Sequence, residues 1–176
     1  DLHYPLRRQR QMCIRDSYKI AGSYFPNDNL KINLQYRIRK ENEWLIWTED
    51  NKFGLYDSEQ DTVSIGLNWF SGNKHEIRLK SQFVALQADN PQSLISDSGG
   101  YLYDSDDLIK PFTQGVVSFQ VRYKYEIAPL SYLYLVYSKG GTSYDEDEDY
   151  SKSEIFNQPW NNPSDEVYSI KFRLKY

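Results

Sequence analysis

The chain has 176 residues, of which 39% are hydrophobic and 16% are aromatic, and its formal net charge is −4. Its single cysteine excludes a disulfide framework and a zinc site built from several cysteines. No apolar run reaches the roughly 18 residues of a transmembrane helix, and the length suits one domain.

The first seventeen residues match the translation of a sequencing adapter. Every codon is compatible with a flow-cell primer, an index and a transposon-based adapter read in one frame. We therefore interpret residues 1–17 as non-native and residues 18–176 as the domain to be explained. A basic nucleic-acid-binding arm, the rival interpretation of Arg7, Arg8 and Arg10, is set aside, and we expect no nucleic-acid partner. The remaining part has 17 basic and 23 acidic residues, a net charge of −6, and neither cysteine nor methionine.

Alternation of apolar and polar residues predicts seven β-strands. The expected ranges, in chain order, are 18–25, 30–39, 62–70, 75–86, 115–127, 130–139 and 166–176. Side chains of a strand point alternately to its two sides, so each of these strands has one apolar and one polar face. In the second strand, for example, Leu30, Ile32 and Leu34 alternate with Lys31 and Asn33.

The connections between these strands alternate between short and long. Short turns are expected at 26–29, 71–73 and 128–129, and long connections at 40–61, 87–114 and 140–165. A helix can form only within one of the long connections. Tight turns at one end and long loops at the other are typical of outer-membrane barrels, whose turns are periplasmic and whose loops are external.

The sequence therefore predicts an all-β fold, an antiparallel up-and-down transmembrane β-barrel. Bacterial barrels of one chain have an even number of strands, so about seven strands indicate an N-terminally truncated fragment. The expected location is the bacterial outer membrane, with a periplasmic C-terminus and extracellular long loops. Outer-membrane lipid, lipopolysaccharide and the barrel assembly machinery are the expected partners. The machinery would read the closing strand, whose apolar stripe is Tyr168, Ile170, Phe172, Leu174 and Tyr176.

Charge predicts which face is turned to the lumen. The polar strand faces carry two acidic residues, Glu76 and Glu126, against ten basic ones. The basic residues are Lys31, Arg37, Arg39, Arg78, Lys80, Arg122, Lys124, Lys171, Arg173 and Lys175. Exposing Lys or Arg to lipid near the midplane costs about 2–4 kcal/mol each, so we expect a lumen-facing basic wall that favours anions. Pairing with carboxylates of further strands or of a plug is the alternative, and both stay open.

Few residues suggest catalysis or metal binding. The acidic run 145–149 lacks the glycine and glutamate positions of an EF-hand loop, and we expect a solvated loop bridged to lipopolysaccharide by divalent cations. His75 and Glu76 should point to opposite faces of a strand, and we expect them to be structural. The tryptophans of 44–47 and Trp160 could stack on sugars or anchor loops, and both interpretations stay open.

The sequence contains no nucleophile elbow, phosphate-binding glycine loop or metal-ligand spacing. We therefore expect no catalytic residue, no metal site and no cofactor. Whether the protein is an enzyme stays open, and a role other than catalysis is favoured for this part of it.

Six short segments carry a family resemblance through their order and spacing. They are 44–47, 67–70, 75–80, 121–125, 128–131 and 133–140. Together they resemble the C-terminal barrel of a large family of uncharacterised outer-membrane proteins. Members of that family carry an N-terminal module similar to family-nine carbohydrate-binding domains, and the family has no established catalytic residues to transfer to this chain.

The expected function is that of an outer-membrane pore or scaffold linked to surface binding or uptake of glycans or other ligands. The resemblance implies that an upstream module would supply part of the glycan binding. One alternative is the membrane anchor of a carbohydrate-active surface enzyme whose catalytic or binding domain lies upstream. A second alternative is a soluble, lipocalin-like ligand-binding barrel.

Overall fold

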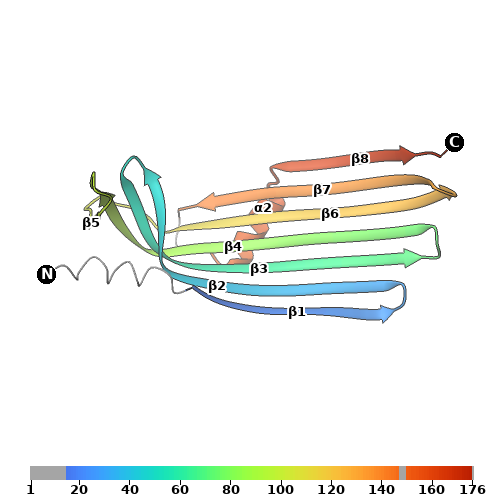
Figure 1. The fold of residues 1–176 in the computed structure, drawn as a ribbon, viewed down its shortest axis with the longest axis horizontal. Coiled ribbons are helices and arrows are strands. Elements are labelled where there is room, and N and C mark those ends of the chain that lie inside the picture. Colours follow the sequence, from blue (N-terminus) through green and yellow to red (C-terminus); the bar gives the residue numbers. More distant parts are fainter. Residues whose placement is uncertain (1–14, 147–149, 176) are drawn as a thin grey trace.

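The computed structural model describes residues 15–146 and 150–175. In this part of the chain, one antiparallel sheet has the order β1-β2-β3-β4-β6-β7-β8, and the short β5 pairs with β4 (Figure 1). The elements are β1 (Arg15–Asn27), β2 (Leu30–Glu49), β3 (Lys52–Ser71), β4 (His75–Ser96), β5 (Leu102–Asp104), β6 (Phe112–Ala128), β7 (Ser131–Asp145), α2 (Lys152–Asn161) and β8 (Asp165–Arg173). The predicted antiparallel, up-and-down arrangement is confirmed, with one helix inside the third long connection.

The sheet is not closed into a barrel. Among the described residues, β1 pairs only with β2, and β8 pairs only with β7, so both edges are open. β1 begins at Arg15, and three residues of the segment predicted to be non-native therefore pair with β2. Ladder hydrogen bonds use the main chain, so this pairing does not depend on where the residues come from.

The prediction of a loop over 40–61 is wrong, because these residues form the far half of the β2–β3 hairpin. The ladder continues through the pair Trp47↔Phe53 to a turn at Asp50. Main-chain hydrogen bonds hold this extension, and they do not need the apolar alternation from which the strands were predicted. β4 likewise extends into the predicted second connection and ends at Ser96.

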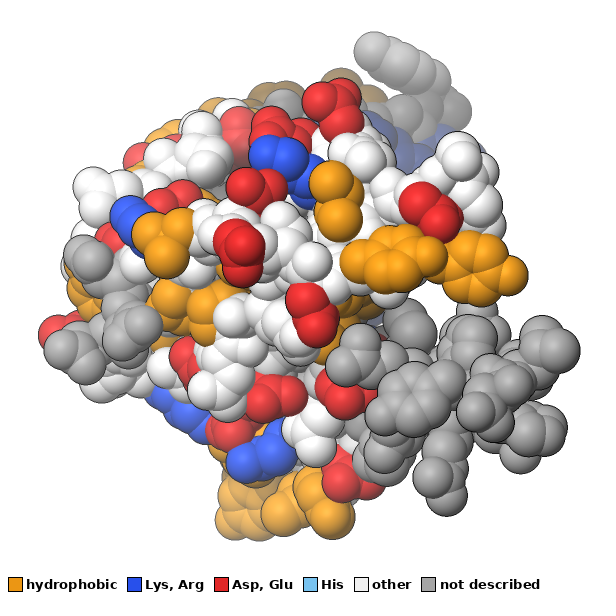
Figure 2. Space-filling model, turned by 90° about the vertical axis from the view of Figure 1, so that its left-hand side faces the viewer, with side chains coloured by type: hydrophobic (Ala, Val, Ile, Leu, Met, Phe, Trp, Pro, Cys, Tyr) orange, Lys and Arg blue, Asp and Glu red, His pale blue; other side chains and the backbone are white. Residues whose placement is uncertain are grey.

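The two ends of the sheet differ, as the alternation of short and long connections predicts. The tight turns after β1, β3 and β6 lie at one end, together with the C-terminal end of β8 (Figure 1). The tip of the β2–β3 hairpin and β5 lie at the opposite end. We call these the turn end and the loop end. Acidic side chains are spread over the loop end, onto which Figure 2 looks.

One face of the sheet, which we call the outer face, is apolar. The strand register places Tyr36, Val63, Phe83 and Val117 side by side across β2, β3, β4 and β6. The other face is polar and hollow. A central hollow of about 720 Å³ on this face is lined by residues of β1, β2, β3, β4 and β6. A hollow shared by five neighbouring strands requires the sheet to curl toward its polar face. We call this curved polar face the polar trough.

Helix α2 packs on the outer face near the loop end. A capping box starts it, since the Ser151 hydroxyl accepts from the Glu154 amide and the Glu154 carboxylate accepts from the Ser151 amide. Ile155 and Pro159 are buried against the sheet. Trp160 packs against Phe83 and Phe119 with ring centroids 6.1 and 5.5 Å apart. In the described part of the chain, no helix has the length and apolar character needed to cross a membrane.

Two glycines allow α2 to lie close to the sheet. A Cβ atom on Gly115 would collide with the carbonyl oxygen of Ile155, and one on Gly141 would collide with that of Pro159. We expect Gly141→Val to weaken the docking of α2 by about 2 kcal/mol through overpacking. Hydrogen exchange of the α2 amides would measure the change.

The neighbouring residue supplies the control for that substitution. A Cβ atom on Gly140 would meet only the Val117 carbonyl oxygen, at 3.9 Å. Gly140→Val should therefore leave the protection of α2 unchanged, because its side chain points to the polar trough. Equal exchange rates in the two valine variants would contradict the role of Gly141.

Candidate functional site: the polar trough

At the turn end of the trough, one carboxylate lies among three cations. The Glu76 side chain is 12% exposed and forms an ion pair with Arg78. Arg122 Nη2 lies 3.7 Å and Lys124 Nζ lies 3.8 Å from its carboxylate oxygens. The register explains the cluster, since Glu76 is opposite Lys124 and Arg78 is opposite Arg122. Glu126 lines the same turn end beside Lys124, and the two carboxylates do not neutralise the three cations, so this turn-end cluster attracts anions.

The structure brings part of the predicted basic wall together. Lys31 joins the row of Arg78 and Arg122, because Asn68 of β3 lies between Lys31 and Arg78 in the register. Lys80 lines the central hollow, opposite Gln120. These residues share the polar trough with the turn-end cluster.

The other predicted wall residues lie apart from that cluster. Arg37 lies near the middle of β2, opposite Thr62, and Arg39 lies closer to the loop end, where its Nη1 donates to Gln60 Oε1 at 3.1 Å. Lys171 and Arg173 are on the open edge strand β8, opposite Tyr134 and Tyr132 of β7. Lys175 follows β8, and its amide donates to the Ser131 hydroxyl at 3.1 Å.

Near the loop end, the trough contains a second pocket of about 420 Å³, which we call the amide pocket. Gln60 and Gln114 flank Leu86 on the two neighbouring strands. Gln82 lies on the same face of β4, two residues before Val84. Three amide side chains thus surround an aliphatic floor in the middle of a polar sheet face.

An aromatic group closes the amide pocket toward the loop end. Phe112 is its centre, with ring centroids 6.4 Å from Trp44, 5.3 Å from Tyr56 and 5.3 Å from Tyr144. Trp44 lines the pocket directly. Tyr56 is buried, and its ring packs edge-on against Phe112. This contact fixes the position of the Phe112 ring.

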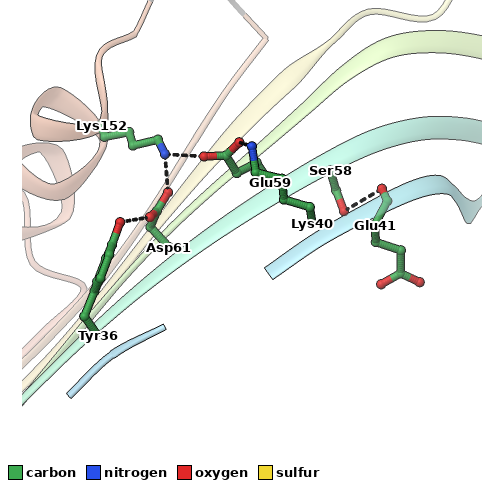
Figure 3. Close-up of polar contacts among 7 residues, drawn as sticks. All are labelled: Tyr36, Lys40, Glu41, Ser58, Glu59, Asp61 and Lys152. Atoms are coloured by element: carbon green, nitrogen blue, oxygen red, sulfur yellow. Dashed lines mark hydrogen bonds and ion pairs between the residues drawn. The ribbon is translucent and has the colours of Figure 1, made fainter. Parts of the chain in front are cut away.

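A polar network on the outer face holds α2 (Figure 3). Lys152 Nζ lies 2.5 Å from Asp61 Oδ2 and also pairs with Glu59. The Tyr36 hydroxyl donates to the other oxygen of Asp61, and Lys40 Nζ lies 2.6 Å from Glu59. Asp61 is 2% exposed, so its charge depends on these partners.

The charges of this network shift the pKa values of its members. Hydrogen bonds from Lys152 and Lys40 lower the pKa of Glu59 below its usual 4.5. Burial alone would lower the pKa of Lys152, but its hydrogen bonds to Asp61 and Glu59 outweigh burial and raise that pKa above 10.5. The charged forms of both groups are therefore favoured in the folded state.

We expect the docking of α2 to be strongest between about pH 5 and 10. The lowered pKa of Glu59 stabilises the folded state at pH values above 4.5. This contribution is lost as the pH falls through the pKa of Glu59 in the folded state. The raised pKa of Lys152 stabilises the folded state at pH values below 10.5. This contribution is lost as the pH rises through the pKa of Lys152 in the folded state. Trp160 fluorescence against pH would measure the docking.

The capping box titrates in the same acid range, since hydrogen bonds from Ser151 lower the pKa of Glu154. Glu154→Gln keeps an acceptor at this position and removes the charge, so the acid transition that remains in this variant belongs to the network around Lys152. A transition centred near pH 7 would contradict the assignment to this network.

The structure shows what surrounds the other predicted residues. His75 and Glu76 do point to opposite faces, and the His75 ring bonds the Tyr123 hydroxyl at 2.7 Å and stacks on Tyr125 at 4.9 Å. In the acidic run 145–149, positions 147–149 lie outside the described residues. Among the described residues, no group of three or more His, Cys, Asp or Glu side chains could hold a metal ion.

The tryptophans have separate surroundings. Trp160 is packed between α2 and the sheet, with Lys139 Nζ 4.6 Å from its ring, which favours the anchoring interpretation for this residue. Trp47 is 63% exposed, and its indole nitrogen donates to the Asp50 carbonyl at 3.0 Å, so it fixes its own turn. Trp44 lines the amide pocket of the trough.

β8 presents its apolar stripe on the outer face. Tyr168, Ile170 and Phe172 are exposed along β8, and Leu174 follows them. The Tyr168 ring packs against Tyr137 of β7 in a tilted arrangement, with ring centroids 4.8 Å apart. The predicted last member of the stripe, Tyr176, lies outside the described residues.

Sequence reasoning missed three features of the site. The Ser151-x-x-Glu154 pattern is a capping-box signal that could have located α2. Val84 and Leu86 break the polar alternation of β4 and could have marked the floor of the amide pocket. The position of Glu76 among three cations needed the register between β4 and β6, which the sequence does not contain.

The trough thus offers an electropositive turn end, a hollow centre, and an end where amides and aromatic rings surround an aliphatic floor. These groups can bind and orient polar ligands through hydrogen bonds and charge. Comparisons with protein-family models, with curated proteins and with solved structures found no match to the chain.

Proposed function

We propose that this chain forms part of the wall of an outer-membrane β-barrel whose lumen is the polar trough. In this role it serves as a pore or scaffold for surface binding or uptake of polar ligands such as glycans. The observation that carries the proposal is the direction of curvature, because the sheet curls around its polar face and turns its apolar face outward. A soluble lipocalin-like barrel would need the opposite arrangement, with apolar residues inside.

The apolar part of the outer face reaches from the turn end to α2. In β4 it extends from Ile77 to Ala85, nine residues interrupted by Ser81, and α2 covers its last part at Phe83. With α2 placed at the membrane boundary, this length is comparable with the about 9–11 residues of a tilted membrane-crossing strand. In β3 the apolar part ends at Val63. Toward the loop end, the next side chains on the same face are those of Asp61 and Glu59. This change of polarity supports a membrane boundary at the loop end, where α2 and its polar network lie.

Large apolar side chains outside the α2 contact support a lipid-facing surface. Ile20 of β1 is 76% exposed, and Ile170 of β8 is 68% exposed. Each square ångström of apolar surface removed from water contributes about 25 cal/mol, so lipid contact would stabilise this face. Long β-hairpins beyond the boundary, such as the tip around Asp50, would then reach outside the membrane.

The open edges fit one part of a larger barrel. The unpaired groups of β1 and β8 would be exposed to hydrocarbon in a membrane, where each unsatisfied main-chain group costs several kcal/mol. We therefore infer that strands outside this sequence pair with both edges and close the barrel. An even total strand number is expected.

Cell fractionation and gel migration test the proposal. Expressed with the strands that close the barrel, the folded protein should sediment with the outer membrane and migrate faster on an unheated gel than after boiling, because a barrel resists detergent until it is heated. A protein that remains in the supernatant and migrates identically before and after boiling would refute the membrane location.

The turn-end cluster predicts the ion preference of the pore. Planar-bilayer currents through the assembled barrel should favour anions, and the variant Arg78→Gln/Arg122→Gln should lower the anion-to-cation permeability ratio several-fold. Lys110→Gln is the control, because Lys110 pairs with Glu146 outside the trough at 3.4 Å. Cation-selective currents in the unmodified protein would show that carboxylates of other strands neutralise the cluster.

A further inference from the structure

The amide pocket differs in chemistry from the rest of the polar trough. Its charged lining residues are Arg39 and Glu41, one of each sign. The Arg39 guanidinium already donates to Gln60 Oε1 at 3.1 Å. The turn-end cluster, in contrast, sets three cations around one carboxylate. The amide pocket is therefore suited to an uncharged ligand, while anions are drawn to the opposite end of the trough.

Three glutamines make the pocket able to bind hydroxyl groups. A hydroxyl donates one hydrogen bond and accepts others, so its ideal partner does both. The amides of Gln60, Gln82 and Gln114 each contain a donor and an acceptor, whereas ammonium groups only donate and carboxylates only accept. The register spreads these amides over three neighbouring strands, so they can reach different hydroxyls of one ligand.

The floor and one wall of the pocket are apolar. Val84 and Leu86 lie between the amides, and Val116 beside them is 36% exposed. Trp44 forms part of the wall at the loop end, next to Phe112. A ligand that fits must therefore combine an apolar patch with a rim of groups that form hydrogen bonds.

We propose that the amide pocket binds a neutral saccharide. A pyranose ring has this combination, with C–H groups on its faces and hydroxyls around its edge. The C–H groups would contact Trp44 and the aliphatic floor, and the hydroxyls would bond to the three glutamines. A volume of about 420 Å³ lies within the range of about 300–1,000 Å³ for small-molecule sites.

The saccharide inference rests on the proposed function, because it takes the pocket to be the external mouth of a lumen. The pocket lies at the loop end, which the proposed function places outside the cell. A sugar bound there would be the first contact of a surface glycan with the lumen. The turn-end cluster, at the other end of the trough, would not take part in this binding.

Saccharide binding can be measured on the closed barrel, which contains this chain and the strands that pair with β1 and β8, refolded in a zwitterionic detergent that has no sugar headgroup. Maltose, cellobiose and chitobiose are the neutral probes, and glucuronate and inorganic phosphate are the anionic ones. Tryptophan fluorescence and calorimetry should show saturable binding of at least one neutral disaccharide. Phosphate should not compete with it.

Paired variants test the residues of the pocket. Gln114→Leu should weaken the binding about tenfold, as expected for loss of hydrogen bonds to a bound ligand. Gln120→Leu on the same face of β6 lines the central hollow instead and should leave the affinity unchanged. Trp44→Ala should abolish the binding, and Trp47→Ala should not. Heat-modifiable gel migration checks that each variant is folded.

The outcomes separate the two proposals. Absence of saturable binding for all three disaccharides, or tighter binding of glucuronate or phosphate, would overturn the saccharide inference. Equal losses in Gln114→Leu and Gln120→Leu would also overturn it. An outer-membrane, heat-modifiable protein without sugar binding would leave the proposed function intact. A soluble protein that binds sugar through Gln114 would support the pocket and refute the membrane location.

Discussion

Leu79→Lys should destabilise the membrane-inserted sheet by about 2–4 kcal/mol, the cost of placing a lysine against lipid near the bilayer midplane. Leu79 lies on the outer face of β4, between Leu67 of β3 and Val121 of β6. In the proposed barrel these side chains contact hydrocarbon. Urea titration of the protein in lipid vesicles, followed by the heat-modifiable gel shift, would measure the loss of stability.

Ser64→Lys is the matched variant on the other face. Ser64 lines the central hollow of the trough, with Gln35 and Gln82 as its cross-strand neighbours. A lysine there faces water, so we expect a change below about 1 kcal/mol. If Leu79→Lys proved as mild as Ser64→Lys, the outer face would not be in contact with lipid, and a soluble sheet would be the better interpretation.

Lys152→Met should weaken the docking of α2 by about 3 kcal/mol, the lower end of the range for breaking a buried ion pair. The lower end applies because Lys152 is 42% exposed, although Asp61 is 2% exposed. Methionine keeps most of the side-chain volume and removes the charge, which leaves the Asp61 carboxylate with the Tyr36 hydroxyl as its remaining partner in the network. Hydrogen exchange of the α2 amides would report the change.

Two further variants test that explanation. Lys110→Met breaks a pair whose partners are 60% and 55% exposed, and such pairs contribute about 0–1 kcal/mol, so α2 should not respond. Lys152→Met/Asp61→Leu removes both charges and should recover part of the stability, because no buried carboxylate then lacks a cation. A double variant less stable than Lys152→Met would contradict the assignment.

The strands could be predicted where one face is apolar and the other is polar. Leu30, Ile32 and Leu34 of β2 show this alternation, and each lies on the outer face of the sheet. The part of the β2–β3 hairpin formed by residues 40–61 lacks a regular alternation of apolar and polar residues, and we predicted a loop there. Pairing there follows from the ladder already formed below it, together with the turn at Asp50, so local sequence preference could not reveal it.

The candidate site could be predicted only in outline. The strand pattern placed Arg78, Lys80, Arg122 and Lys124 on the polar face, and the register confirms that these residues share one side of the sheet. It did not reveal that Glu76 lies within reach of three of them. That juxtaposition depends on which residue of β4 is opposite which residue of β6, a shift of one residue being enough to remove it.

The sequence by itself determined the antiparallel order of strands, the two-faced character of the sheet and the separation of tight turns from long connections. These follow from period-two patterning and from turn-forming residues, which act within a few positions of the chain. The tertiary structure decided the direction of curling, the docking of α2 through Lys152 and Asp61, and the grouping of three glutamines around Leu86. Each joins residues far apart in the chain, and cross-strand register and packing set such contacts.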